Sequence, residues 1–247
     1  MVLSGQYLER SVVVGELDAL YHRGTREPPC VIAAPHPALG GSMLSPVVAE
    51  LAWALTRAGH PTMRFDYRGV GASRGVSPHV AGSGHFADLR EEVADLQRIC
   101  EHLLASTQMT EVCAVGYSFG AAVALEAAEE SRVGRLVLVA PPTQLYDFGA
   151  ISALRKPLLI VCAHQDSYCD RRALRPPDGA RLEIIPHSDH FFGRGLTELG
   201  KTVAAWLRGD RSDYIAPPDA PEGGGVAPEL ELDPGDGEPL ELDTDPE

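Results

Sequence analysis

The feature that constrains this sequence most is the five-residue stretch Gly116-Tyr-Ser-Phe-Gly120, which lies between an apolar run and a run of small residues. Residues 112–115 have the composition of a buried strand, and residues 121–128 are rich in Ala, which favours a helix. A serine between a strand and a helix must sit on a tight turn, and the two flanking glycines remove the Cβ atoms that would clash there. The pattern predicts a strand, a sharp turn and a helix, with the hydroxyl of Ser118 clear of the backbone.

The same stretch carries a chemical prediction. The start of the helix after Ser118 would bring free backbone N–H groups and a partial positive charge to a place where an oxyanion could form. A serine hydroxyl alone is a weak nucleophile, so it needs a base, and the base needs a carboxylate to orient it. In serine sites on such a turn, called nucleophile elbows, the carboxylate follows the serine along the chain and the histidine comes last.

Few acids after Ser118 lie at the ends of predicted strands. Asp166 comes just past the apolar strand expected at residues 157–163, and His190 lies in the loop after the last expected strand, residues 182–185. We therefore predict that Ser118 is the nucleophile, that His190 is the general base and then the general acid, and that Asp166 orients His190.

Two residues close to His190 offer alternatives. His187 competes with His190 as the base. Asp189 could in principle orient a histidine, although a direct sequence neighbour rarely reaches the far ring nitrogen. His187 and His190 also have the spacing of half a metal site, but no third ligand with convincing spacing accompanies them. We therefore predict neither a metal nor another cofactor.

An oxyanion hole for this chemistry needs two backbone N–H groups. One is expected from Phe119, directly after the nucleophile. The other is expected from the loop that follows the short apolar strand at residues 30–34, with Ala38 as the first choice and Leu39 as the alternative. His36, in the same loop, is interpreted as a structural histidine that holds the loop.

Apolar runs of strand type alternate with helical periodicity along the whole chain. Strands are expected at residues 11–14, 17–22, 30–34, 62–67, 112–115, 136–140, 157–163 and 182–185, and helices at 46–58, 89–104, 121–128 and 199–207. This alternation predicts an α/β fold with a mostly parallel central sheet and helices on both faces. Ligands bind such sheets at the carboxyl ends of the strands, where the candidate residues fall.

Four stretches together resemble the α/β-hydrolase superfamily, and most of all its compact bacterial members. They are Ala34-Pro-His36-Pro with Gly40-Gly41, residues 64–73 (RFDYRGVGAS), residues 116–120, and His190 followed by two phenylalanines. The sequence departs from the pattern at Ala34, where a first His is common, and at Asp66, which replaces Asn. The resemblance covers about residues 10–208 and implies the α/β-hydrolase fold.

The resemblance also implies an activity. It indicates a serine hydrolase that cleaves an ester or thioester of a small-molecule acyl substrate through an acyl-enzyme. Only residues 141–156 separate the strand after the elbow helix from the next one, which is too short for a lid domain, so an open site is implied. The alternative is a hydrolase-fold protein that binds a partner without cleaving it, which the complete set of triad candidates disfavours.

Two groups of charged residues near these motifs have simpler interpretations than a role in the site. Asp66 and Arg68 are expected to brace the loops beside Ser118. Arg171, Arg172 and Arg175 are expected to form a solvated helix face rather than a site for an anionic substrate.

The negative charge of the chain is concentrated at its C-terminal end. The formal net charge is −14, but residues 210–247 hold 13 acidic residues and one basic residue, which leaves residues 1–209 at −2. We predict one domain over residues 1–209 and a disordered acidic tail, rich in Pro and Gly, over residues 210–247. The tail is interpreted as solubilising, although it could bind an unidentified partner. A domain without basic excess argues against nucleic acid as a partner.

The cysteines and the apolar runs suggest a compartment. Five scattered cysteines without a C-x-x-C pair favour free thiols in a reducing environment. The N-terminal residues lack a signal-peptide pattern, and no apolar run reaches about eighteen residues, the length of a membrane span. We therefore expect a cytoplasmic protein.

Overall fold

The computed structural model describes residues 9–79, 88–129 and 132–210. The expected tail, apart from its first residue, lies outside these ranges. Each helix that the structure describes is either too short or too polar to cross a lipid bilayer.

An eight-stranded sheet forms the centre of the molecule, in the order β1-β2-β4-β3-β5-β6-β7-β8. The strands are β1 Arg10–Val14, β2 Leu17–His22, β3 Cys30–Ala33, β4 Thr62–Phe65, β5 Val112–Tyr117, β6 Val133–Val139, β7 Leu158–Ala163 and β8 Arg181–Ile185. β1 and β2 form an antiparallel hairpin and β2 runs antiparallel to β4, while all other neighbours are parallel. The expectation of a mostly parallel sheet is confirmed.

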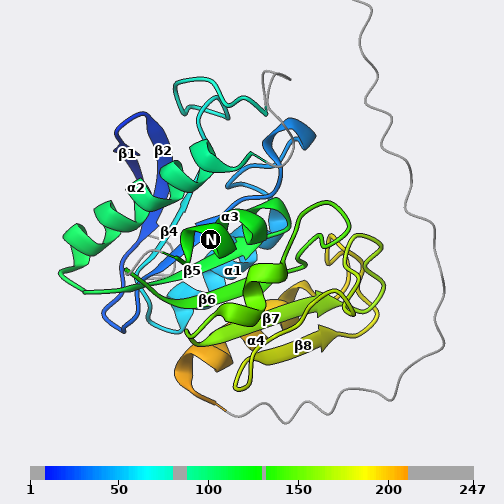
Figure 1. The fold of residues 1–247 in the computed structure, drawn as a ribbon. Coiled ribbons are helices and arrows are strands. Elements are labelled where there is room, and N and C mark those ends of the chain that lie inside the picture. The colour runs from blue at the N-terminus through cyan, green and yellow to red at the C-terminus, as the bar shows by residue number, and fades with distance from the viewer. Residues whose placement is uncertain (1–8, 80–87, 130–131, 211–247) are drawn as a thin grey trace, which may run out of the picture.

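Helices cover both faces of this sheet (Figure 1). α1 Pro46–Arg57 and α4 Leu196–Arg208 pack against each other on one face, and α2 Arg90–Thr107 and α3 Phe119–Ala127 pack together on the other. Two short 3₁₀ helices, η1 Pro37–Leu39 and η2 Gly149–Ala153, lie in the loops after β3 and β6. Because η2 is the only helix described between β6 and β7, the described chain carries no lid domain there.

Three of the strands that precede candidate residues are buried along their whole length. Every residue of β3, β5 and β7 is buried, which explains their continuous apolar sequences. β5 lies between β3 and β6, with Val115 opposite Ile32 on one side and Val137 on the other. The chain leaves β3 toward β4 on one side and returns to β5 on the other, so the crevice expected in such sheets opens at the carboxyl ends of β3 and β5.

Several elements differ from the sequence expectations, and three of the differences have a clear physical cause. α3 begins at Phe119 rather than 121, because the backbone turns completely within Ser118. β6 begins at Val133 rather than 136, because its first residue already pairs with Val112 of β5. Residues 171–173 form a turn and not the expected helix. Two prolines follow Arg175, and a proline disfavours helical backbone at the residue before it.

Close contact between α3 and the sheet depends on two glycines. A Cβ on Gly116 would overlap the carbonyl of Gly120, and a Cβ on Gly120 would overlap the carbonyl of Ala33 on β3. Both obstacles are backbone atoms, which cannot rotate away. These contacts set how deeply the first turn of α3 sits at the end of β3 and β5.

Gly120→Ala is therefore expected to lower the free energy of unfolding by about 2–4 kcal/mol, because α3 must move away from β3. Urea denaturation of the purified variant measures this loss. Gly193→Ala is the matched control. Its added Cβ would lie 3.9 Å from the Asp189 carboxylate, an ordinary contact, and the expected change stays within about 1 kcal/mol. Equal losses in the two variants would show that the close approach of α3 is unimportant.

Candidate active site

Ser118 occupies a strained turn at the end of the central strand. Its φ of 54° and ψ of −120° lie in a region that non-glycine residues rarely adopt. The turn is held because the Ser118 N–H donates to the carbonyl of Val139 on β6 over 2.9 Å. Tyr117 is the last residue of β5 and Phe119 the first of α3. The hydroxyl therefore stands above the crevice, as the sequence pattern predicts.

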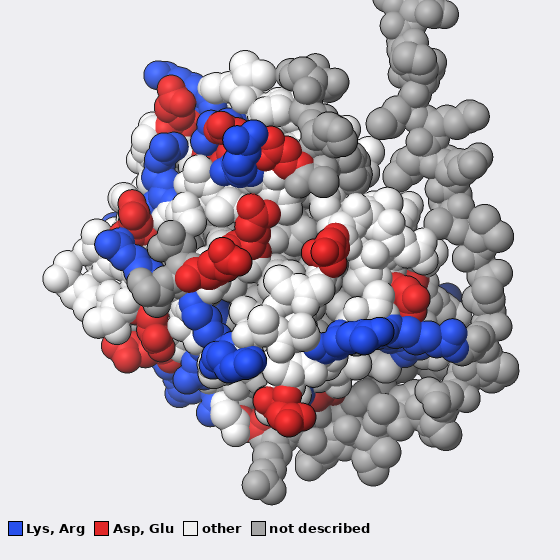
Figure 2. Space-filling model, viewed as in Figure 1, with Lys and Arg blue, Asp and Glu red and all other residues white. Residues whose placement is uncertain are grey.

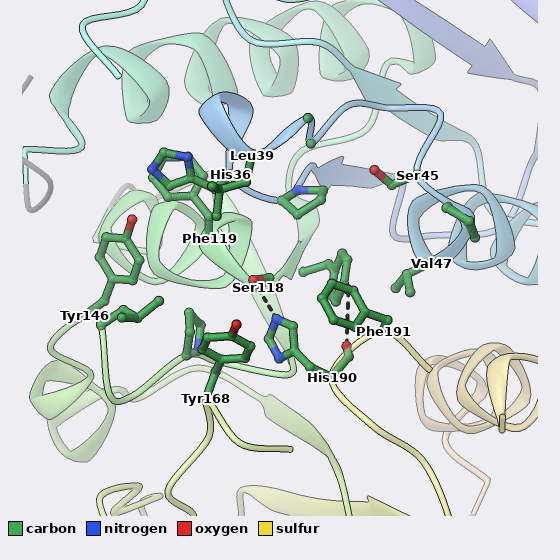
Figure 3. A pocket seen from close by; sticks show the side chains of 17 residues that line it. His36, Leu39, Ser45, Val47, Ser118, Phe119, Tyr146, Tyr168, His190 and Phe191 are labelled. Carbon is green, nitrogen blue, oxygen red and sulfur yellow. Dashed lines mark hydrogen bonds between the residues drawn. The ribbon is translucent and has the colours of Figure 1, made fainter. Parts of the chain in front are cut away.

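His190 and Asp166 complete a chain of hydrogen bonds to this hydroxyl (Figure 3). His190 Nε2 lies 2.9 Å from Ser118 Oγ, and His190 Nδ1 lies 2.9 Å from each carboxylate oxygen of Asp166. An ionised carboxylate only accepts hydrogen bonds, so Nδ1 carries the ring proton and Nε2 is left to accept the serine proton. The structure brings together three side chains that are far apart in sequence.

The acid and the histidine are held by their surroundings. The side chain of Asp166 is only 1% exposed and accepts a hydrogen bond from the Tyr168 N–H over 2.9 Å. The Tyr117 hydroxyl donates to the backbone carbonyl of His190 over 3.1 Å. Burial, followed by the nearby charge of Asp166, raises the pKa of Tyr117. Tyr117 therefore stays protonated and keeps this donor.

The two alternative residues lie elsewhere. His187 is exposed, whereas the ring of His190 is buried. Asp189 is also exposed, and its Oδ1 accepts from the Gly193 N–H over 3.1 Å, so its carboxylate closes a local turn. The geometry thus separates these two residues from the chain of hydrogen bonds that includes Ser118.

The loop after β3 is arranged differently from what the sequence suggests. Ala38, the first choice for the second oxyanion donor, directs its N–H at His36 Nδ1 over 3.2 Å. Leu39, the alternative, donates its N–H to the carbonyl of His36 over 3.1 Å. His36 thus holds the loop, as the sequence interpretation expects. Phe119 begins α3, where a backbone N–H has no intrahelical acceptor.

A second set of contacts fixes the far end of this loop. The Met43 N–H donates to Asp66 Oδ1 over 2.6 Å, and Arg64 donates to the Met43 carbonyl over 2.9 Å. Arg68 instead pairs with Asp95 of α2. Asp66 therefore braces the loop beside Ser118, whereas Arg68 ties its own loop to α2.

A mainly apolar cavity of about 310 Å³ opens above Ser118. It is lined by Pro35, His36, Leu39, Gly40, Gly41, Ser45, Pro46, Val47, Tyr117, Ser118, Phe119, Pro142, Leu145, Tyr146, Tyr168, His190 and Phe191. In Figure 3, Phe119, Leu39 and Tyr146 lie on one side of Ser118, and Phe191 and Val47 lie on the other. Arg171, Arg172 and Arg175 are exposed and are not part of this lining.

Sequence reasoning missed several lining residues. Tyr168 contacts the ring of His190 with 4.9 Å between ring centroids, and Tyr146 contacts Phe119 at 5.7 Å. Tyr168 lies two residues after Asp166, so its nearness to the acid was a usable signal. Tyr146 lies in the loop after β6, and no motif marks it.

Comparisons with known proteins agree with this fold. A family model described as serine aminopeptidase, S33, matches residues 39–149. A solved α/β serine hydrolase homologue from Coxiella burnetii is 27% identical, with a TM-score of 0.68, and the match covers 81% of this chain and 96% of that one. The chain has the α/β-hydrolase fold and is similar to α/β serine hydrolases. The expected fold is confirmed.

Two further proteins are similar to this chain. A serine hydrolase without a lid from Xanthomonas campestris is 27% identical, with a TM-score of 0.65, and the match covers 81% of this chain and 93% of that one. An uncharacterised protein from Rickettsia prowazekii is 24% identical over 216 residues, which cover 81% of this chain and 87% of that protein.

The buried His36 gives the stability of this protein a testable pH dependence. Burial, followed by the nearby His79, lowers the pKa of His36 to about 4, whereas a histidine in an unfolded chain has a pKa of about 6.5. Between these two values the unfolded chain binds more protons at this position than the folded one. The contribution of His36 is therefore present above about pH 6.5 and decreases as the pH falls toward 4.

His36→Asn is expected to make stability fall less steeply than in the wild type over this pH window, because Asn does not titrate but can still accept from the Ala38 N–H. Urea denaturation at several pH values gives the two slopes. The control is His187→Asn, at an exposed position with a φ of 54° that Asn tolerates. If both variants change the slope equally, burial of His36 is not the cause.

Proposed function

We propose that this protein is a serine hydrolase that transfers the acyl group of an ester or thioester to water, with Ser118, His190 and Asp166 as its catalytic triad. The observation that carries the proposal is the continuous chain of hydrogen bonds from Asp166 through His190 to Ser118, each 2.9 Å long. The hydroxyl at its end faces a cavity large enough for a small ligand.

The first half-reaction forms an acyl-enzyme. Ser118 Oγ attacks the carbonyl carbon of the substrate while His190 Nε2 takes the hydroxyl proton. The carbonyl electron pair moves to oxygen, and Phe119 N–H donates to the resulting oxyanion. When the tetrahedral species collapses, the bond to the leaving group breaks and His190 gives its proton to the departing oxygen or sulfur. Asp166 stays ionised and stabilises the imidazolium.

The second half-reaction repeats these steps with water. His190 takes a proton from water, whose oxygen attacks the acyl carbon, and then returns the proton to Ser118 Oγ as the ester bond to the enzyme breaks. The products are the carboxylic acid and the free enzyme. The chemistry uses side chains, backbone N–H groups and water alone, so the proposal includes neither a metal nor a cofactor.

Ala38 remains the proposed second oxyanion donor. Its bond to His36 Nδ1, at 3.2 Å, is at the long end of N–H hydrogen bonds. The developing negative charge of an oxyanion is a stronger acceptor than a neutral ring nitrogen. We propose that Ala38 N–H turns from His36 toward the oxyanion during the reaction, while Leu39 keeps its bond within the loop.

The lining of the cavity favours esters over peptides with a free N-terminus. An aminopeptidase, the activity named by the matching family model, binds the ammonium group of its substrate close to the scissile bond. Among the described residues, no Asp or Glu side chain lines the cavity to pair with that charge. An unpaired ammonium group would lose its hydration without compensation there.

The mixed charge of the surface favours a small-molecule substrate over nucleic acid. Figure 2 shows Lys and Arg interspersed with Asp and Glu on the face covered by α2 and α3. Arg90 of α2, for example, pairs with Asp88, and both side chains are exposed. A nucleic-acid surface would instead gather positive charge.

The thiols support the proposal of a cytoplasmic location. The five cysteines are buried and free, and the Sγ atoms of Cys162 and Cys169 lie 3.5 Å apart without a bond. The hydrogen bond with the Cys162 thiol, followed by burial, raises the pKa of Cys169, which keeps the Cys169 thiol protonated. Such a pair persists as thiols in a reducing compartment.

A fluorophosphonate probe is expected to label the protein covalently, because the hydrogen-bonded Ser118 is the activated nucleophile. Ser118→Ala should abolish labelling, as measured by mass spectrometry of the intact protein. Ser45→Ala removes another hydroxyl that lines the cavity and should label like the wild type. Labelling that survives Ser118→Ala would reject the assignment.

Asp166→Asn is expected to leave the fold intact and to reduce turnover by about a thousandfold or more, because the amide no longer holds His190 in the required tautomer. Asp189→Asn should keep turnover close to that of the wild type, since the amide oxygen can still accept from the Gly193 N–H. Ester hydrolysis and circular dichroism are measured for both variants under identical conditions. A nearly normal Asp166→Asn enzyme beside an inactive Asp189→Asn enzyme would make Asp189 the orienting residue.

A further inference from the structure

The cavity extends to both sides of Ser118, and different residues line the two sides. Tyr146 and Leu39 lie on the Phe119 side, where the Phe119 and Tyr146 rings are 5.7 Å apart (Figure 3). Phe191 lies on the His190 side, with 5.5 Å between the two rings. A substrate held at Ser118 must therefore place its two halves in two different surroundings.

The position of His190 decides which half lies on which side. His190 Nε2 must reach the leaving group to protonate it, so the leaving group lies on the His190 side, near Phe191 and Val47. The acyl group then extends the other way, toward Tyr146. This assignment rests on the proposed roles of Ser118 and His190.

The Tyr146 side ends at a thin wall. Leu145 and Tyr146 line the catalytic cavity, and they also line a second hollow of about 650 Å³ between α3 and the segment around η2. We call these two residues the dividing wall. Tyr146 is 8% exposed and packs on Phe119, so its ring holds a fixed place in the wall. The wall limits the length available to an acyl group.

The lining also limits the charge of the substrate. Within the described residues, no Asp, Glu, Lys or Arg side chain lines the catalytic cavity. His36 lies on the acyl side, and burial lowers its pKa to about 4, so its ring is neutral near pH 7. An ionised group on the acyl chain would lose water without gaining a partner.

We propose that the substrate carries a short, uncharged, apolar acyl group that lies against the dividing wall, that Tyr146 sets its maximum length, and that the leaving group lies against Phe191 and Val47. The cavity volume of about 310 Å³ is at the lower end of the range of roughly 300–1,000 Å³ for ligand pockets. Both halves of the substrate are therefore small.

The first experiment varies the acyl length at a constant leaving group. The ratio of kcat/KM for p-nitrophenyl octanoate to that for the butyrate is measured at pH 7. The wild type is expected to prefer butyrate, and Tyr146→Ala should raise the octanoate-to-butyrate ratio by about tenfold or more, because it joins the two hollows. Tyr146→Phe keeps the ring and should keep the wild-type ratio. A ratio within one preparation does not depend on how much of a variant is folded.

The matched control is on the other side of Ser118. Val47→Ala should leave the octanoate-to-butyrate ratio unchanged, but it should raise the turnover of butyl butyrate relative to methyl butyrate. An unchanged acyl ratio in Tyr146→Ala would overturn the proposal. If Val47→Ala instead changes the acyl ratio and Tyr146→Ala changes the leaving-group ratio, the acyl group lies near Val47 and the leaving group near Tyr146, which would contradict the proposal.

The second experiment tests charge. Methyl butyrate and monomethyl succinate have acyl chains of equal length, and the wild type should prefer the neutral ester by about a hundredfold or more. Equal turnover of the two esters would reject an uncharged acyl site. Failure of the proposed function looks different: no ester is turned over and the fluorophosphonate does not label Ser118. Labelling and turnover with unchanged ratios would reject only the assignment of the acyl group to the dividing wall.

Discussion

The architecture of the site depends on the backbone of a single residue. Ser118 holds a φ of 54° between the end of β5 and the start of α3. Two contacts keep it there, the hydrogen bond from its N–H to Val139 and the close approach of Gly120 to Ala33. The strain is local, but the restraint comes from three parallel strands, β3, β5 and β6, whose register is fixed by buried apolar side chains. The rigid sheet lets a strained turn persist.

Around this turn the sheet gathers loops from distant parts of the chain. The loop after β7 supplies Asp166, and the loop between β8 and α4 supplies His190. Each loop is held by contacts of its own, namely Tyr117 to the His190 carbonyl and Tyr168 N–H to Asp166. The side chains that would carry out proton transfer are thus positioned by residues that take no part in it. Preorganisation of this kind is what a hydrolytic site requires, since the donors must be in place before charge develops.

The sequence predicts the parts of this arrangement that depend on local pattern and chain order. The strand, turn and helix around Ser118 follow from glycine spacing and apolar runs. The meeting of Asp166 and His190 follows from their places after parallel strands, whose carboxyl ends share one edge of the sheet. The bond between Ala38 N–H and His36 could not be predicted, because it depends on a ring orientation set by packing against His79 and Phe119. Residues 171–173 form a turn where a helix is expected, and the two prolines after Arg175 are the sequence signal for this difference.

Burial of Asp166 has a consequence for how such a protein can change in evolution. Its carboxylate is 1% exposed, and His190 is the side chain that satisfies both of its oxygens. Loss of His190 would leave a buried charge with half of its partners, which strongly destabilises a fold. Replacement of Ser118 leaves the Asp166–His190 pair intact, and a glycine there would also relieve the positive φ. Related proteins that have lost catalysis are therefore expected to lose the serine first and to keep the acid and the histidine, because this pair stabilises the fold.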